Sequence, residues 1–235
     1  MLQLIVGTGE IRPQQISPDF KTSSLLAIDR PAVTQTIDPH AGMYSSIGLY
    51  AAVGYAVLDP ILTGVRENSA KSALVDATIY GEASAMTTAL TNIAKMAVRR
   101  PRPIAYIDFE KNIKTNPNYT NSDTDSALSF FSGHAAECGT ITAVASYLAF
   151  ARSPHSARPW VTLLVGTALT SFVSVERVRS GEHFTTDVIA GSFTGAGIGV
   201  LTAHLHRVDK VPPLWVGWQR ANYGDGGALT LNGVL

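Results

Sequence analysis

The amino-acid sequence predicts an all-α protein, a bundle of about five to six helices with irregular segments at both ends. From residue 43 onward, alanine, leucine and other small residues dominate, and apolar positions recur at helical spacing instead of alternating as in strands. The chain has 235 residues and is 46% hydrophobic, which suffices for one domain with a sizeable core. We expect an N-terminal segment over residues 1–42, a helical core over 43–206 and an irregular C-terminal tail over 207–235.

The expected helices follow from this periodicity. Prolines interrupt residues 1–42, where we expect a single short helical stretch around 21–28. The region 69–99 is amphipathic, because apolar residues such as Leu74 and Tyr80 are interleaved with serine, threonine and acidic residues. The long helices are expected over 43–58, 69–99, 133–151, 160–178 and 184–206.

Proline and glycine positions set the expected ends of these elements. Pro60 follows the first apolar run, and Pro101 and Pro103 follow the second, so neither helix is expected to continue. Residues 104–128 are rich in Asn, Thr, Ser and Asp and predict a long polar connection. The tail at 207–235 contains Pro-Pro and Gly-Gly pairs, which are typical of an irregular or β-like segment.

Three apolar runs leave membrane insertion open. Residues 43–58 and 160–175 contain no charge over 16 positions each, and 188–205 contains no Asp, Glu, Lys or Arg over 18. A simple transmembrane helix needs about 20 apolar residues, and the mean hydropathy of the chain is only +0.14. Core helices of a soluble or surface-bound domain and true membrane helices both fit these lengths. The very short apolar run at the N-terminus has no basic region before it, so no signal peptide is expected.

Charge and cysteine usage exclude several classes of function. Lys+Arg and Asp+Glu are 18 each, so no global basic field attracts nucleic acid and we expect no nucleic-acid partner. Cys138 is the only cysteine, which excludes an intramolecular disulfide framework and predicts a buried structural thiol. His204 and His206 are two residues apart on an expected helix, which points their rings away from each other. We therefore expect no metal site and no cofactor.

Lys95 and Arg102 form the first of three segments suited to phosphate binding. They lie seven residues apart, two helical turns on one face, although Pro101 makes the second turn a loop. Lysine offers a compact charge, and arginine offers a planar fork that grips two phosphate oxygens. The alternative is that Arg99, Arg100 and Arg102 are cations at a helix C-terminus, where the helix dipole favours them.

The second segment is Ser132-Gly133-His134, which precedes an apolar run. Ser129 or Ser132 can cap a helix that begins here, and a helix N-terminus presents unpaired N–H groups to an anion. Gly133 lets the backbone approach a ligand closely, and His134 in the first turn can donate a proton. An ordinary helix cap with an incidental histidine is the alternative.

The third segment contains Arg177, His183 and Asp187. His183 and Asp187 are four residues apart, so they are neighbours if both lie on one helix. A carboxylate there can accept the Nδ1 proton and hold the ring with Nε2 outward. Ser180-Gly181 separates Arg177, at the end of one helix, from His183, at the start of the next. A solvated His–Asp pair remains the alternative.

In this order, the three segments resemble the motifs of the type 2 phosphatidic acid phosphatase superfamily, which includes bacterial acid phosphatases, lipid phosphatases and vanadium haloperoxidases. Two positions depart from the family pattern. Phe131 replaces a proline, which alters the start of the turn, and Glu176 replaces a serine, which is expected to affect phosphate affinity or pH dependence. The matching segments are Lys95-x6-Arg102-Pro103, Phe131-Ser132-Gly133-His134 and Glu176-Arg177-x5-His183-x3-Asp187.

The resemblance implies a helical bundle of the phosphatase/haloperoxidase type over about residues 43–206, and a metal-independent phosphatase. It implies that His183, held by Asp187, attacks phosphorus to form a phosphohistidine, while His134 protonates the leaving oxygen and then activates water. The substrates would be phosphate monoesters, with lipid phosphates or diphosphates among the candidates. The phosphate-binding residues implied are Lys95, Arg102, Ser132, Gly133 and Arg177.

Two other functions are compatible with the same residues. A vanadate-dependent haloperoxidase would use the same anion site, and a non-catalytic phosphate-binding membrane scaffold would not need the histidines. The implied partners are a phosphorylated small molecule or lipid and a membrane surface or bilayer, with the oligomeric state left open. The implied location is the cell envelope, either membrane-associated or periplasmic.

Overall fold

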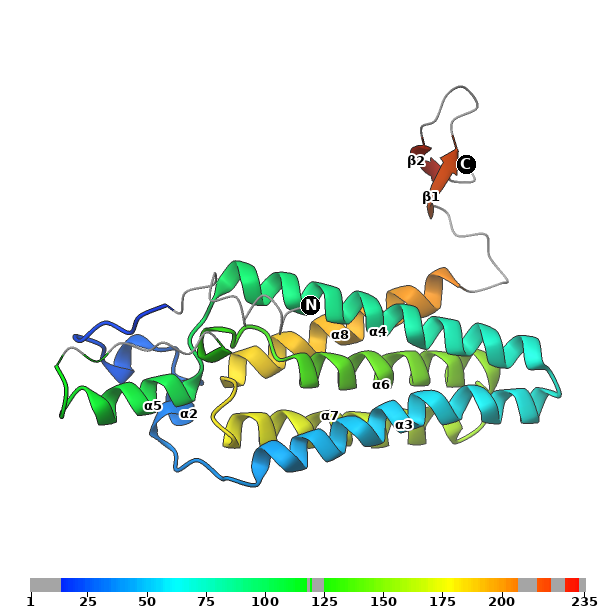
Figure 1. Cartoon of the computed structure of the whole chain (residues 1–235). Coiled ribbons are helices and arrows are strands. Elements are labelled where there is room, and N and C mark those ends of the chain that lie inside the picture. The colour runs from blue at the N-terminus through cyan, green and yellow to red at the C-terminus, as the bar shows by residue number, and fades with distance from the viewer. Residues whose placement is uncertain (1–13, 118, 120–124, 207–214, 221–226, 233–235) are drawn as a thin grey trace.

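The structure, a computed structural model, describes residues 14–117, 119, 125–206, 215–220 and 227–232. Five long helices lie side by side, and the shorter helices α2 and α5 lie together near one end of them (Figure 1). The elements are η1 (Thr22–Ser24), α2 (Arg30–Thr34), α3 (Ala41–Glu67), α4 (Ala70–Val98), α5 (Pro103–Asn112), η2 (Asp125–Ala127), α6 (Gly133–Arg152), α7 (Arg158–Arg179), α8 (Thr185–Leu205), β1 (Trp215–Arg220) and β2 (Gly227–Asn232).

Helix α6 is the centre of the bundle and contacts each of the other four long helices. Small residues allow its backbone to lie close to α8. A Cβ atom added at Gly139 would lie 2.5 Å from the carbonyl oxygen of Ser192, and Gly195 likewise leaves room for the carbonyl of Ala136. The backbones of α6 and α8 can approach this closely only because glycine has no side chain at the contact. The all-α prediction for the body of the molecule is therefore confirmed, and its alanine- and glycine-rich composition reflects this packing.

The first long helix extends further than expected. Helix α3 continues through Pro60 to Glu67, whereas the sequence predicted an end at residue 58. Buried Asp59 accepts hydrogen bonds from Arg158 of α7 (3.0 Å) and from the hydroxyl of Tyr80 of α4 (3.1 Å). Pro60 has no N–H and therefore removes one hydrogen bond from the helix backbone. The contacts of the neighbouring Asp59 with α4 and α7 compensate for this loss, so the helix continues.

The polar connection expected at 104–128 was also wrong in part, because α5 occupies Pro103–Asn112. Helix α4 ends at Val98, before Pro101 and Pro103, as expected. Pro103 also begins α5, since its missing N–H costs nothing at the first helical position. Ala105 and Phe109 are buried against Ile16 of the N-terminal segment, which gives the short helix an apolar face. In that segment the stretch predicted at 21–28 contains only the turn η1, and the helix lies further along as α2.

The C-terminal tail contains an antiparallel hairpin. Strand β1 pairs with β2 from Trp215 opposite Asn232 to Arg220 opposite Gly227. The β-like interpretation of the tail therefore agrees with the described part of it.

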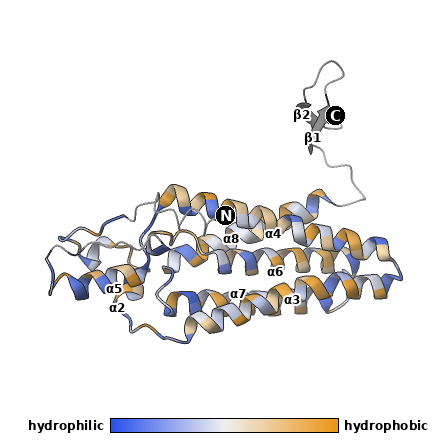
Figure 2. Ribbon diagram, viewed as in Figure 1, coloured by the Kyte–Doolittle hydropathy of each residue, from blue (hydrophilic) through white to orange (hydrophobic). Residues whose placement is uncertain are grey.

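Three of the long helices, α3, α7 and α8, are long and apolar enough to cross a membrane, by length and composition. Large apolar side chains point outward from them, including Tyr50, Val65, Leu164 and Phe193, each more than 70% exposed. Figure 2 shows apolar residues spread along the length of these helices. An apolar exterior of this extent marks a surface that is covered by a membrane or a partner.

Candidate active site

The three sequence motifs meet at one end of the bundle, where α4, α7 and the starts of α5, α6 and α8 come together (Figure 1). Backbone hydrogen bonds join the motif segments pairwise. The N–H of Ser129 donates to the carbonyl of Arg100 (2.9 Å), that of Ile104 to Gly181 (3.0 Å), and that of Ser132 to Asp187 (3.1 Å). Segments far apart in sequence are therefore fixed against one another by the main chain itself, which limits how far their side chains can separate.

The serine-glycine-histidine segment forms the start of α6, as predicted. The Ser132 hydroxyl accepts a hydrogen bond from the N–H of Ala135 (3.4 Å) and caps the helix. Gly133 is the first helical residue, and His134 follows it, half-buried. Burial, together with the charges of Arg177, Lys95 and Arg102, lowers the pKa of His134 to about 4. The helix N-terminus adds a partial positive charge to this end of the bundle.

Lys95, Arg102 and Arg177 gather there as three closely spaced cations. Arg102 is buried, and Lys95 and Arg177 are half-buried. Burial and the charges of both arginines lower the pKa of Lys95 to about 8. Among the residues that the structure describes, the buried Nε of Arg177 has no hydrogen-bond partner. Like charges held together at low exposure repel each other, so an anion between them is strongly favoured.

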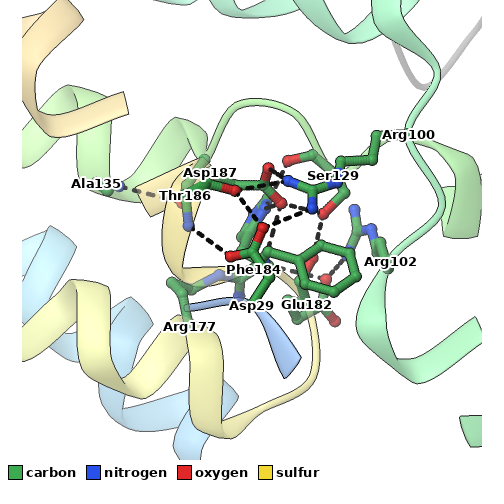
Figure 3. A network of polar contacts seen from close by, with 12 residues as sticks. Asp29, Arg100, Arg102, Ser129, Ala135, Arg177, Glu182, Phe184, Thr186 and Asp187 are labelled. Atoms are coloured by element: carbon green, nitrogen blue, oxygen red, sulfur yellow. Dashed lines mark hydrogen bonds and ion pairs between the residues drawn. The ribbon is translucent and has the colours of Figure 1, made fainter. Parts of the chain in front are cut away.

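One carboxylate already lies between two of these cations. Glu182 forms ion pairs with both Arg102 and Arg177, the latter at 3.1 Å through Oε2 (Figure 3). Arg102 is also paired with Asp125 at 3.0 Å through its Nη2 atom. The arginines therefore form a clamp that binds a carboxylate oxygen in this structure.

His183 is 1% exposed and is fixed by the main chain. Its Nδ1 atom lies 2.7 Å from the carbonyl oxygen of Ser129, and a carbonyl only accepts, so Nδ1 carries the proton. Nε2 then has the lone pair. Burial, with the nearby charges of Arg177, Arg102 and Lys95, holds the pKa of His183 well below its usual value. The ring is consequently neutral at neutral pH, the state in which an imidazole can act as a nucleophile.

The direct contact expected between Asp187 and His183 is replaced by an indirect one. Helix α8 begins at Thr185, so His183 precedes the helix and does not share a face with Asp187. The Oδ2 atom of Asp187 lies 4.0 Å from Nδ1, and it accepts hydrogen bonds from the Ser129 hydroxyl (2.5 Å) and the N–H of Phe184 (2.9 Å). Asp187 thus fixes Ser129, whose carbonyl in turn orients His183.

A second layer of charges fixes Asp187. Arg100 donates to Oδ1 of Asp187 (2.6 Å) and to Oδ2 of Asp29 (2.8 Å), and its guanidinium lies 3.9 Å over the ring of Phe184 (Figure 3). Asp29 also accepts bonds from the N–H (2.9 Å) and the hydroxyl (2.7 Å) of Thr186 at the start of α8. Asp29 and Asp187 are both fully buried, so the network is screened little by water. Arg100, which follows the C-terminus of α4, therefore also holds two buried carboxylates in place.

The unusual Glu176 lies outside the clamp. It is buried and pairs with Arg179 at 2.8 Å, and Arg179 in turn pairs with Asp38 at 2.6 Å. Arg177, its neighbour in sequence, pairs with Glu182 instead. Glu176 therefore supports Arg179, whose pair with Asp38 joins the N-terminal segment to the end of α7.

Sequence reasoning found the cations, the cap and the histidines of this site but missed the roles of five other residues, Ser129, Arg100, Glu182, Asp29 and Asp125. Ser129 and Arg100 lie within three residues of the motif residues Ser132 and Arg102, so their place in the sequence could have indicated that they belong to the site. Glu182 directly precedes His183 but carries no pattern of its own, and Asp29 lies outside every motif. Within the described ranges there is no group of three or more His, Cys, Asp or Glu residues that could hold a metal ion. Cys138 is buried, as expected for a structural thiol.

Comparison with known proteins agrees with this geometry. The family model described as "PAP2 superfamily" matches residues 76–210, more than half of the chain. A solved structure, a transmembrane PAP2-type phosphatidylglycerolphosphate phosphatase from Bacillus subtilis, shares the fold with a TM-score of 0.54 at 20% identity, over 79% of this chain and 86% of that chain. No curated protein sequence matches. The three motifs, the bundle that joins them and the family match together show that the chain belongs to the PAP2 superfamily.

Proposed function

We propose that this protein is a membrane-associated, metal-independent phosphatase that hydrolyses phosphate monoesters through a phosphohistidine. The observation that carries the proposal is the placement of a neutral, oriented His183 beside the cations Lys95, Arg102 and Arg177. Membership in the PAP2 superfamily supports the same reaction class. Three fixed cations supply the positive charge that phosphoryl transfer requires.

In the first step, Nε2 of His183 attacks phosphorus, and the bond from phosphorus to the leaving oxygen breaks. His134, which the negative charge of the bound phosphoryl group keeps protonated, donates its proton to that oxygen, so that the leaving group departs protonated. Lys95, Arg102 and Arg177 bind the equatorial oxygens, where charge collects in the transition state. In the second step, His134 takes a proton from water, the water oxygen attacks phosphorus, and the P–N bond breaks to release phosphate.

An apolar groove beside the site favours a lipid substrate. A cavity of about 680 Å³ lies between α6, α7 and α8, lined by side chains that include Val175, Val188 and Phe193. Val175 lies in the last two turns of α7, two residues before Arg177, and Val188 lies in the first turn of α8, one residue after Asp187. Together with three helices of membrane-spanning length, this groove suits the chain of a lipid phosphate or diphosphate at the cell envelope.

A phosphate-release assay on EDTA-treated protein tests the proposal. We expect release from phosphatidate and from an isoprenyl diphosphate, and slower release from a water-soluble monoester, in each case without added metal. Activity that EDTA abolishes and a divalent cation restores would contradict metal independence. No release from any of the three substrates would contradict the reaction itself.

Orthovanadate is expected to inhibit this activity competitively, because its tetrahedral anion fits the same cations and can bond to Nε2 of His183. The measurement is the dependence of phosphate release on vanadate at several substrate concentrations. If vanadate and peroxide instead produced halide oxidation while phosphate release stayed absent, the haloperoxidase alternative would replace this proposal.

Substitution of Asp29 by asparagine is expected to lower kcat roughly tenfold and to leave KM nearly unchanged, since one charge-assisted contact is lost. Arg100 loses a charged partner, and it is the residue that positions Asp187. Asp187 in turn positions Ser129, whose carbonyl orients His183, so the orientation of His183 becomes less fixed. The cations that bind phosphate keep their own contacts. Steady-state kinetics separate the two constants. Asp38→Asn is the matched control, because Asp38 belongs to the same segment and pairs with exposed Arg179. An equal fall in both variants would assign Asp29 a purely structural role.

A further inference from the structure

The arginine clamp holds an internal anion. The carboxylate of Glu182 lies against Arg102 and Arg177 through the same oxygen, Oε2. Gly181, with φ of 72°, turns the chain immediately before it, in a conformation that favours glycine, and the side chain of Glu182 stays 31% exposed. A half-exposed side chain that follows a tight turn can leave the clamp for solvent without disturbing the bundle.

We propose that Glu182 is the internal counter-anion of the arginine clamp and that an incoming phosphoryl group displaces it. This inference rests on the proposed function, because it assigns Arg102 and Arg177 to the binding of phosphate. A carboxylate and a phosphoryl group are both oxygen anions, and each is bound by the same guanidinium donors. Two anions cannot occupy those donors together, so binding becomes an exchange of Glu182 for substrate.

The clamp keeps its shape during this exchange. Asp125 binds Nη2 of Arg102 at 3.0 Å, while Glu182 pairs through Nη1. When Glu182 leaves, Asp125 still orients the guanidinium, and Nη1 can turn its contact from Glu182 to the incoming anion. Nη2 of Arg177 is freed at the same time, and its buried Nε has no partner among the described residues. The incoming anion therefore meets donors that are already in place.

Displacement has a quantitative signature. If Glu182 only competes for the clamp, it raises the Kd of every anion by one common factor, whatever the charge of that anion. Through-space repulsion by a carboxylate that remains nearby would instead penalise a dianion more than a monoanion. The same competition lowers the affinity of the clamp for the product orthophosphate, because Glu182 returns to the clamp when orthophosphate leaves.

The test is anion binding to the full-length protein in detergent, measured by titration calorimetry with orthophosphate, orthovanadate and dimethyl phosphate. Glu182→Gln keeps the size of the side chain and removes its charge. We expect the Kd of all three anions to fall by the same factor, about tenfold, the change that follows from losing one charge-assisted competitor. Glu182→Ala provides a second, independent variant of this half-exposed position.

Asp125→Asn is the control for charge, because it removes a carboxylate from the other nitrogen of the same guanidinium. We expect the affinity for orthophosphate to stay unchanged or to weaken in that variant, since Arg102 loses its anchor. An unchanged or higher Kd in both Glu182 variants would overturn the proposal. The proposal would also be overturned if Asp125→Asn lowered the Kd of orthophosphate as much as the Glu182 variants do. The same holds if Glu182→Gln lowered the Kd of orthophosphate more than that of dimethyl phosphate. Either result would indicate long-range repulsion by carboxylates and not competition for the clamp.

Binding and turnover separate this inference from the proposed function. If Glu182→Gln lowers the Kd of all three anions by the same factor while the protein releases phosphate from no substrate, the counter-anion assignment stands and the phosphatase proposal fails. If phosphate release occurs but the Kd values do not change, the phosphatase stands and Glu182 is only a structural partner of the clamp.

Discussion

Replacement of His183 by glutamine or alanine is expected to reduce phosphate release by more than about 10⁴-fold, the scale seen when a covalent nucleophile is removed. His183 is buried, its Nδ1 proton is fixed by the Ser129 carbonyl, and its low pKa keeps the ring neutral. Glutamine can still donate to that carbonyl but offers no nitrogen lone pair to phosphorus. The measurement is single-turnover phosphate release, together with thermal unfolding to show that the bundle remains folded.

His206→Gln is the matched control for this substitution. His206 lies at the other end of α8, is exposed, and pairs with Glu82 at 2.6 Å, so its loss is expected to leave turnover unchanged. An alkaline quench of the wild type with substrate labelled in the phosphoryl group should trap label on His183. Turnover near the wild-type rate in His183→Gln, or label on another residue, would refute its assignment as nucleophile.

Replacement of Arg102 by lysine is expected to lower kcat/KM by roughly 10²–10³-fold, as when one transition-state donor is removed. Arg102 uses its two terminal nitrogens for different purposes, one toward Asp125 and one toward the clamp. An ammonium group keeps the charge but cannot make both contacts in one plane. Steady-state kinetics on a phosphate monoester measure the change, and the fall should lie mainly in kcat.

Arg99→Lys is the appropriate comparison, because Arg99 is an exposed arginine three residues earlier that caps the end of α4. We expect its kcat/KM to stay within about twofold of the wild type, as is usual for surface substitutions. If Arg102→Lys behaved in the same way, the guanidinium would not be gripping the transferred phosphoryl group. If both variants lost activity equally, general positive charge at this end of the bundle would matter more than the geometry of Arg102.

The course of the helices was predictable wherever local signals dominate. The period of apolar residues placed the helices of the bundle, and Ser132 at the start of α6 behaved as a cap should. Local rules failed at Pro60, which was expected to end a helix that the buried contacts of Asp59 instead sustain. There, contacts with distant residues outweigh the local cost of the proline. Helix α4 did end before Pro101 and Pro103, as expected, but Pro103 also begins α5, where a polar connection was expected.

Part of the candidate site was likewise predictable from the sequence, and part depended on the tertiary structure. The sequence indicated Arg102, Arg177 and His183, because the chemistry of phosphate limits which side chains can serve and motif spacing keeps them in order. It could not indicate that Asp187 reaches His183 through Ser129, since that depends on where α8 begins. Residues four apart share a helix face only when both lie in the helix, and His183 lies two residues before the first residue of α8.

The sequence by itself determined the class of fold, the three motif segments and the kind of anion that they suit, because each depends on residue type and short-range spacing. Only the tertiary structure decided which charges share a pocket. Asp29 meets Arg100 across 71 residues, and Glu182 occupies the clamp between Arg102 and Arg177. Such pairings are set by where distant segments meet when apolar faces are buried together, and no local pattern records the distance between them.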